Sequence, residues 1–287
     1  MKGIILAGGS GTRLWPCTRS ISKQILPVYD KPLIYYPLST LMLAGIREIL
    51  IITTPESHDV FKNLLGDGSQ IGLNLSYEIQ LKPNGLAEAF IIGETFIGDE
   101  SVVLILGDNI FHGNGFGRKL KELQNLHGAI IFGLHVKDPE RYGIAEVDAR
   151  GAVVSIEEKP NKPKSDLAIP GLYFFDNSVV EKSKKVEKSN RGELEITSIL
   201  EMYMRERQLE LKSVDRGTSW MDCGTFDSLN DASNYVRAIE ERQGLKIACI
   251  EEIALKQGWI SNRELLQIAK FLGANEYADY LFNLVQQ

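Results

Sequence analysis

The feature that most constrains the fold is the N-terminal stretch "MKGIILAGGSGTR", in which a short apolar run passes directly into a glycine-rich turn. The run Gly3–Ala7 has the length and composition of a buried strand. Gly8, Gly9 and Gly11 allow a positive φ and have no Cβ, so the backbone N–H groups of this turn can approach an anion closely. The stretch therefore indicates a strand followed by a phosphate-binding turn.

Apolar runs and segments of helical period alternate through the first half of the chain. The predicted strands are Gly3–Ala7, Glu48–Thr54, Leu73–Ile79, Val102–Leu106 and Ala129–Val136, and the predicted helices are Lys31–Ala44, Glu56–Leu65, Leu86–Thr95 and Gly115–Leu126. Thr54 is the expected N-cap and Pro55 the expected first residue of the second helix. Strands such as "ILII" and "VVLIL" are apolar on both faces, which favours an α/β fold with a doubly wound, mostly parallel sheet.

The second half of the chain predicts two further parts. At residues 142–175, β-like pieces separated by prolines indicate a small mixed β region beside the main sheet. The C-terminal part is almost wholly helical in pattern, and Ser261 with Glu264 forms a capping box. We therefore expect an α/β core at residues 1–240 and a helical extension at 241–287.

Charge and cysteine usage argue against several classes of protein. The net charge is −6 and the basic residues are scattered, which is not the pattern of a nucleic-acid or membrane-surface binder. No run approaches the length of about 18 apolar residues that a membrane span requires. Cys17, Cys223 and Cys249 are odd in number and have no metal-ligand spacing, so we expect reduced thiols. The sequence predicts a cytoplasmic protein.

The glycine-rich turn differs from two familiar phosphate-binding loops. The Walker pattern requires Lys and Ser or Thr after its last glycine, whereas Gly11 is followed by Thr12 and Arg13. The dinucleotide fingerprint requires a third glycine where this chain has Leu14. Arg13, with Lys23 further along, indicates a loop that surrounds a highly charged phosphate chain. The alternative is a tight turn without a ligand, and the two cations weigh against it.

Motifs along essentially the whole chain resemble those of one family. They begin with "LAGGSGTRLWP" and continue with "KPNGLAEAF", "LILGDNIF", "RYGIAEVD", "IEEKP", "IPGLYFFD", "RGELEIT" and "WMDCGTFDSL". The chain resembles the sugar nucleotidyltransferases, and within them it is most similar to the glucose-1-phosphate thymidylyltransferases. The resemblance implies a Rossmann-like nucleotide-diphospho-sugar transferase fold and transfer of a deoxythymidylyl group from dTTP to α-D-glucose 1-phosphate. The products would be pyrophosphate and dTDP-glucose, a precursor of dTDP-sugars such as dTDP-rhamnose.

The implied reaction is an in-line attack of the sugar phosphate on the α-phosphorus, so the protein must align two anions and neutralise charge. The resemblance implies Arg13, Lys23 and Lys159 as catalytic residues, and Mg²⁺ held by Asp108 and Asp222. The implied nucleotide-binding residues are Gly8, Gly9, Gly11, Thr12, Arg13, Gln80, Gly85 and Leu86. The implied sugar-phosphate-binding residues are Asp108, Tyr142, Gly143, Glu158, Lys159, Gly171, Tyr173 and Arg191. Without the resemblance, each Asp would more often be a turn former or cap, and Tyr173 a core residue.

The chain departs from the family pattern at three positions. His112 and Leu167 stand where the family more often has Tyr, and Ser198 stands where it more often has Asp. The phosphate and metal residues are intact, so only pocket lining and sugar tolerance are affected. The resemblance also implies a homotetramer with a second site for an inhibitory dTDP-sugar. A uridylyltransferase, a non-catalytic nucleotide-sugar sensor and, more distantly, a nicotinamide dehydrogenase are the alternatives.

Overall fold

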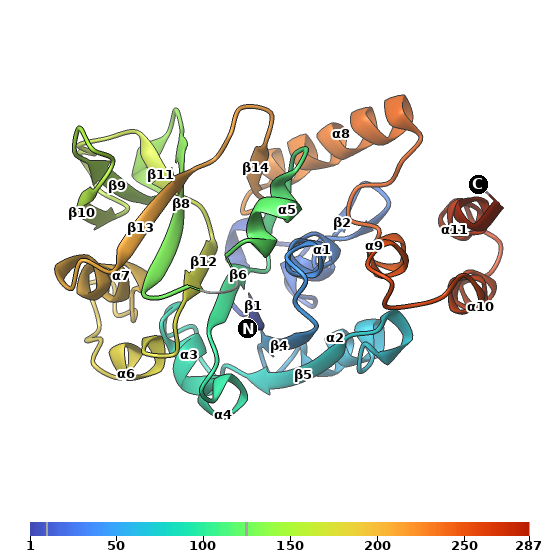
Figure 1. Cartoon of the computed structure of the whole chain (residues 1–287), viewed down its shortest axis with the longest axis horizontal. Coiled ribbons are helices and arrows are strands. Elements are labelled where there is room, and N and C mark those ends of the chain that lie inside the picture. Colours follow the sequence, from blue (N-terminus) through green and yellow to red (C-terminus); the bar gives the residue numbers. More distant parts are fainter. Residues whose placement is uncertain (10, 124–125, 287) are drawn as a thin grey trace.

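The computed structural model describes residues 1–9, 11–123 and 126–286, and in this part of the chain a ten-stranded sheet forms the centre (Figure 1). Its strands are β1 (Lys2–Ala7), β4 (Glu48–Thr53), β5 (Asn74–Ile79), β6 (Val102–Leu106), β8 (Ala129–His135), β9 (Gly143–Val147), β10 (Val153–Glu158), β11 (Leu167–Ile169), β12 (Leu172–Phe175) and β13 (Leu209–Ser213). The strand order is β10-β9-β11-β8-β12-β6-β1-β4-β5, with β13 paired to β8. β6, β1, β4 and β5 are parallel, which confirms the doubly wound class.

Within the described residues, two smaller strand pairs lie outside this sheet. One joins β2 (Pro27–Val28) to β3 (Lys31–Pro32), and the other joins β7 (Asn109–His112) to β14 (Ser219–Asp222). The chain also forms short 3₁₀ helices at η1 (Thr12–Leu14), η2 (Lys23–Ile25), η3 (Ser69–Ile71) and η4 (Pro139–Arg141).

Helices cover both faces of the sheet because successive strand residues point to opposite sides. The α-helices are α1 (Tyr35–Leu43), α2 (His58–Leu65), α3 (Glu88–Ile92), α4 (Glu94–Ile97), α5 (Phe116–Lys121), α6 (Val179–Ser183), α7 (Ile196–Arg205), α8 (Phe226–Gln243), α9 (Ile250–Lys256), α10 (Asn262–Leu272) and α11 (Glu276–Gln286). On β1, Ile5 packs in the cluster that includes α1, α2 and α5. Its neighbour Ile4 packs in the cluster that includes α3, α6 and α7. Both side chains are fully buried.

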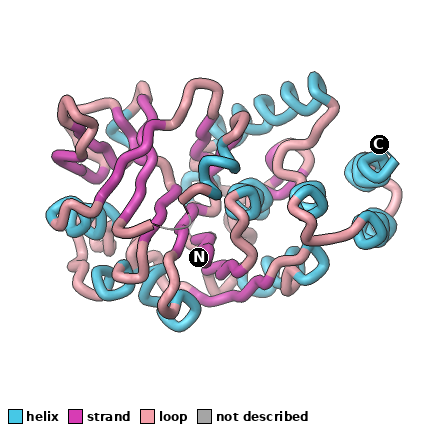
Figure 2. The backbone as a smooth tube through the Cα atoms, in the orientation of Figure 1, coloured by secondary structure: helices cyan, strands magenta, loops and turns pink. Residues whose placement is uncertain are grey.

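The C-terminal helices α10 and α11 lie apart from every strand, as Figure 2 shows. Ser261 caps α10 through the predicted capping box with Glu264. α8 runs without a break across residues 240 and 241 and ends at Gln243, where Gly244 adopts a left-handed conformation. The division into residues 1–240 and 241–287 stays a prediction. Among the described helices, none has the length and apolarity needed to cross a membrane.

The region at 142–175 differs from its sequence-based prediction in one respect. Its strands do not form a unit beside the main sheet but continue that sheet, because β9 and β10 extend it through β11 and β8. β12 lies inside the sheet, antiparallel to both β6 and β8. Phe174 and Phe175 of β12 are fully buried, so the pairing encloses apolar surface on both faces.

Two predicted helix starts are wrong. The helix expected at Lys31 begins at Tyr35, because Lys31 belongs to β3 and its buried ammonium group pairs with Asp30 and with Glu240. The helix expected at Pro55 begins at His58 instead. Residues 54–57 form a turn, in which the Ser57 backbone N–H donates to the Thr54 carbonyl at 3.2 Å.

Two other predicted helices have different extents. The one expected at Leu86–Thr95 is divided at Gly93 into α3 and α4. The one expected at Gly115–Leu126 is α5, which ends at Lys121. Residues 124–125 of that prediction lie outside the described residues.

Candidate active site

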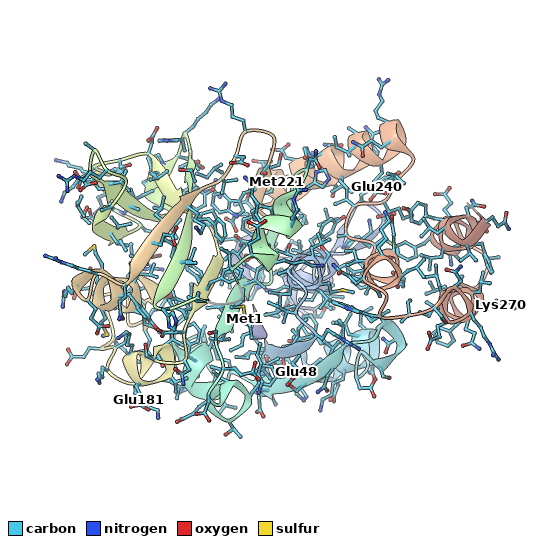
Figure 3. The ribbon with its side chains drawn as sticks, in the orientation of Figure 1. Met1, Glu48, Glu181, Met221, Glu240 and Lys270 are labelled. Carbon is cyan, nitrogen blue, oxygen red and sulfur yellow. The ribbon has the colours of Figure 1, made fainter. Side chains whose placement is uncertain are left out.

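Two buried or half-buried carboxylates from distant parts of the chain meet at the carboxyl end of β6. Asp108 lies two residues after the end of this strand, and Asp222 ends β14. The antiparallel pair of β7 and β14 sets Asp222 opposite Asn109, and the Cys223 backbone N–H donates to the Asp108 carbonyl at 3.0 Å. Figure 3 labels Met221, the residue before Asp222, near the middle of the molecule. The fold thus brings two acidic residues together at this edge of the sheet.

The electrostatics of this pair differ between its two members. Burial by itself would raise the pKa of Asp108, but the Lys23 ammonium group, which contacts its carboxylate, and a hydrogen bond from Asn109 lower that pKa. Burial and the nearby charge of Asp108 raise the pKa of Asp222. Two carboxylates close enough to repel each other form a site where a cation is favourable.

Two arginine side chains lie close to Asp222. A Cβ placed on Gly224 would lie 2.7 Å from Arg13 Nη2 and 3.2 Å from Asp222 Oδ2, so the Arg13 guanidinium and the carboxylate share this corner. Arg141 Nη2 lies 3.6 Å from the same oxygen, Asp222 Oδ2. Arg13 belongs to the glycine-rich loop, in η1, as the predicted phosphate role requires.

Gln80 defines the predicted nucleotide end of the site. It is buried directly after β5, and its Nε2 donates to the Gly85 carbonyl at 3.2 Å and to Glu88 Oε2 at 2.7 Å. A Cβ on Gly8 would lie 2.6 Å from Gln80 Oε1, so the amide is held against the glycine-rich turn. Gly85 has a φ of 116° and lies against the Leu194 backbone, which leaves no room for a side chain.

A cavity of about 560 Å³ lies beside this end of the site. Of the predicted residues, it is lined by Gly9, Gly11, Lys23 and Gln80. Its other walls come from the turn at 54–57, from residues 81–83 and from the loop around Arg19. Thr12 is exposed at the loop and Leu86 packs beside α3, and neither lines the cavity. A cavity of this size is typical of a small-molecule site.

A second cluster, the sugar-side group, surrounds Glu158 and contains the predicted residues Gly143, Lys159, Tyr173 and Arg191. Lys159 Nζ and Arg191 Nη1 each lie 3.6 Å from Glu158 Oε1, and a Cβ on Gly143 would lie 3.3 Å from Glu158 Oε2. Burial raises the pKa of Glu158, while Lys159 and Arg191 favour its charged form. Tyr173 is buried close to this group, and burial and Glu158 raise the pKa of its hydroxyl. The cluster can pair hydroxyl groups with Glu158 and an anion with the two cations.

Asn109 connects the acidic centre to the sugar-side group. Its Oδ1 accepts hydrogen bonds from the Gly171 backbone N–H at 3.1 Å and from Trp220 Nε1 at 2.6 Å. The Trp220 ring packs edge-on against Tyr142, with ring centroids 4.9 Å apart. A Cβ on Gly171 would lie 2.9 Å from Asn109 Oδ1, so Gly171 must stay small.

The sequence-based reasoning missed Asn109 and Arg141 as parts of the site. Both stand beside predicted residues, in "GDN" and "RYG", but the partners that assign them a role lie far away in the sequence. Arg19 and Lys82 were also missed, because only the fold brings their segments to the same cavity.

The chain that carries this site matches a known family. The model of the nucleotidyl transferase family matches residues 2–239, and the chain belongs to this family. A protein from Neisseria meningitidis named glucose-1-phosphate thymidylyltransferase is 54% identical over 288 residues, with 100% of both chains covered. One of the same name from Mycobacterium tuberculosis is 53% identical over 287 residues, again with 100% of both chains covered.

Solved structures carry the same fold. A protein from Bacillus anthracis, solved with sucrose and assigned as a glucose-1-phosphate thymidylyltransferase, has a TM-score of 0.76 and 38% identity, covering 83% of this chain and 95% of that one. A UDP-glucose pyrophosphorylase solved with UDP-glucose has a TM-score of 0.73 and 26% identity, covering 84% of this chain and 99% of that one. The predicted family and fold are thus confirmed.

Proposed function

We propose that this chain is a glucose-1-phosphate thymidylyltransferase that joins dTTP and α-D-glucose 1-phosphate to give dTDP-glucose and pyrophosphate. The observation that carries the proposal is the meeting of Asp108 and Asp222 between a nucleotide end at Gln80 and a sugar-side group at Glu158. The names of full-length relatives at about half identity support the choice of substrates.

The proposed reaction has one covalent step. A phosphate oxygen of glucose 1-phosphate forms a bond to the α-phosphorus of dTTP as the bond to the β-phosphate oxygen breaks, and the electron pair leaves with pyrophosphate. The nucleophile is already an anion, so no general base is needed. Arg13 and Lys23 neutralise the triphosphate and its leaving group, whereas Lys159 and Arg191 bind the sugar phosphate.

Glu158 and Gln80 provide recognition in this proposal. The Glu158 carboxylate accepts hydrogen bonds from sugar hydroxyls, and Tyr142, Gly143 and Tyr173 line the sugar pocket. Gln80 Oε1 accepts a hydrogen bond from a pyrimidine edge, while its Nε2 stays bonded to the Gly85 carbonyl and to Glu88. Gly85 holds this amide through its carbonyl, and its missing side chain makes room for the Leu194 backbone.

Asp108 and Asp222 would hold Mg²⁺, and their chemistry fits that ion. Both are hard oxygen donors, they lie close enough for the Asp108 charge to raise the pKa of Asp222, and two carboxylates leave positions for phosphate oxygens and water. When bound, the ion would supply charge neutralisation and alignment of the phosphates.

The test is pyrophosphate release by the purified protein with glucose 1-phosphate and Mg²⁺, with dTTP and UTP compared side by side. We expect dTTP to be preferred and Asp108→Asn to abolish release. Asp99→Asn is the matched control, because Asp99 is exposed and precedes β6 whereas Asp108 follows it. Equal or faster release with UTP would favour a uridylyltransferase, and no release with either nucleotide would favour a nucleotide-sugar sensor.

Three further proposals come from the resemblance. The protein would work in the cytoplasm in dTDP-sugar synthesis, assemble as a homotetramer and bind an inhibitory dTDP-sugar at a second site. Light scattering of the purified protein tests the assembly, and inhibition by dTDP-rhamnose that does not compete with dTTP tests the second site.

A further inference from the structure

Arg141 holds an unusual position between the acidic centre and the sugar side of the site. It ends η4 and immediately precedes Tyr142 and Gly143. Its Nη1 donates to Asp138 Oδ2 at 2.6 Å, and its Cζ lies 5.3 Å from the centre of the Tyr142 ring. The carboxylate of Asp138 and the ring of Tyr142 therefore hold the guanidinium group in place.

The inner nitrogen of this group lacks a hydrogen-bond acceptor. Arg141 Nη2 is buried and has no hydrogen-bond partner among the described residues, although Asp222 Oδ2 lies 3.6 Å away. A buried N–H of a charged group without an acceptor is costly, so native structures rarely keep one without a reason. The planar guanidinium fork matches the oxygen geometry of a phosphate.

The location of the nitrogen identifies which phosphate it can reach. Two arginines lie near Asp222 Oδ2, Arg13 of the glycine-rich loop and Arg141. Arg13 belongs to the nucleotide side. Arg141 immediately precedes Tyr142 and Gly143, and a Cβ on Gly143 would lie 3.3 Å from Glu158 Oε2, so Arg141 adjoins the group that would bind the second substrate.

We propose that Arg141 binds the phosphate of the sugar 1-phosphate and holds it beside the metal carboxylate Asp222. This inference rests on the proposed function. Arg141 is then a catalytic residue, because it touches the attacking phosphate and offsets its charge as it approaches the triphosphate. Asp138 is a positioning residue that keeps the guanidinium pointed inward.

Steady-state kinetics of Arg141→Gln and Arg141→Lys test the proposal, with Arg150→Gln as the matched control for an exposed arginine outside the site. We expect Arg141→Gln to raise the KM for glucose 1-phosphate about 30-fold, and to leave the KM for dTTP within about twofold of the wild-type value. Arg141→Lys keeps the charge but loses the planar fork, so its KM for glucose 1-phosphate should lie between the values of the wild type and of Arg141→Gln. Asp138→Asn should give a smaller rise.

The outcomes separate this inference from the proposed function. If the wild-type enzyme is active and Arg141→Gln has the same KM for glucose 1-phosphate, the inference alone is overturned. An equal rise in the KM for glucose 1-phosphate and in the KM for dTTP also overturns it, because such a rise marks a merely structural role. An inactive wild-type protein overturns the proposed function. Calorimetric titration with glucose 1-phosphate then decides the inference, which fails if Arg141→Gln binds this ligand as well as the wild type does.

Discussion

Replacing Gly8 by Ala tests whether the turn after β1 positions the amide that would recognise the base. The new Cβ would lie 2.6 Å from Gln80 Oε1, closer than real Cβ contacts allow. The contacted atom is the end of a side chain rather than backbone, so we expect Gln80 to move and the fold to remain. That movement disturbs the Nε2 hydrogen bonds to the Gly85 carbonyl at 3.2 Å and to Glu88 at 2.7 Å.

The size of the effect follows from the hydrogen bonding between Gln80 and the base. One such bond, accepted by Gln80 Oε1, contributes about 0.5–1.5 kcal/mol, so the displaced amide should lower kcat/KM for dTTP by about 2-fold to 12-fold. The KM for glucose 1-phosphate should change less than about twofold, because Gly8 and Gln80 lie at the opposite end of the site from Glu158. Pyrophosphate release at varied dTTP and thermal melting measure both parts of the expectation.

A double-mutant cycle with Gln80→Ala provides the control. If Gly8→Ala acts only through Gln80, then adding it to Gln80→Ala should cause no further loss. Additive losses in the double variant would refute the idea that Gly8→Ala acts through Gln80. An unchanged kcat/KM for dTTP in Gly8→Ala, combined with a lowered melting temperature, would refute it as well.

Other substitutions test the acidic centre, its link to the sugar side and a buried carboxyl in the C-terminal helices. Asp222→Asn removes repulsion from Asp108, so the melting temperature should stay or rise while pyrophosphate release falls at least about 100-fold; a lower melting temperature would contradict this. Trp220→Phe removes the bond to Asn109 and should raise the KM for glucose 1-phosphate about 5-fold, and an unchanged KM would show that the bond does not shape the site. Burial raises the pKa of Glu251 in the folded state above its value of 4.5 in the unfolded chain. The folded state therefore binds this proton more tightly, and it loses stability as the pH rises from the unfolded-state pKa to the folded-state pKa. The melting temperature of Glu251→Gln relative to wild type should therefore increase over that pH range and then level off, and a pH-independent difference would exclude this titration.

Much of the parallel part of the sheet could be predicted from local sequence. β1, β4, β5 and β6 agree with their predictions to within one residue at each end, because strands buried on both faces read as continuous apolar runs. The helix start at Lys31 was wrong for a long-range reason. Its ammonium group is buried against Glu240 at 3.0 Å, a partner that no local pattern reveals.

The candidate site also contains residues that motifs predicted and residues whose role only the structure reveals. Gly8, Gln80 and Lys159 were expected from motifs, and the structure brings each of them to the same strand edge as Asp108 or to the group beside it. Asn109 could not be assigned a role from sequence, because its function depends on Trp220, which is 111 residues away in the chain.

The sequence by itself determined the strand-and-turn start, the chemistry available to the site and the family motifs, because apolar runs, glycines and charged side chains act through their own local properties. Only the tertiary structure decided that Asp222 stands beside Asp108 and that Arg141 faces Asp222 with a nitrogen that has no hydrogen-bond acceptor among the described residues. The physical reason is that these contacts depend on the register of β7 with β14 and on the packing of η4, which join distant segments through backbone hydrogen bonds and buried surface.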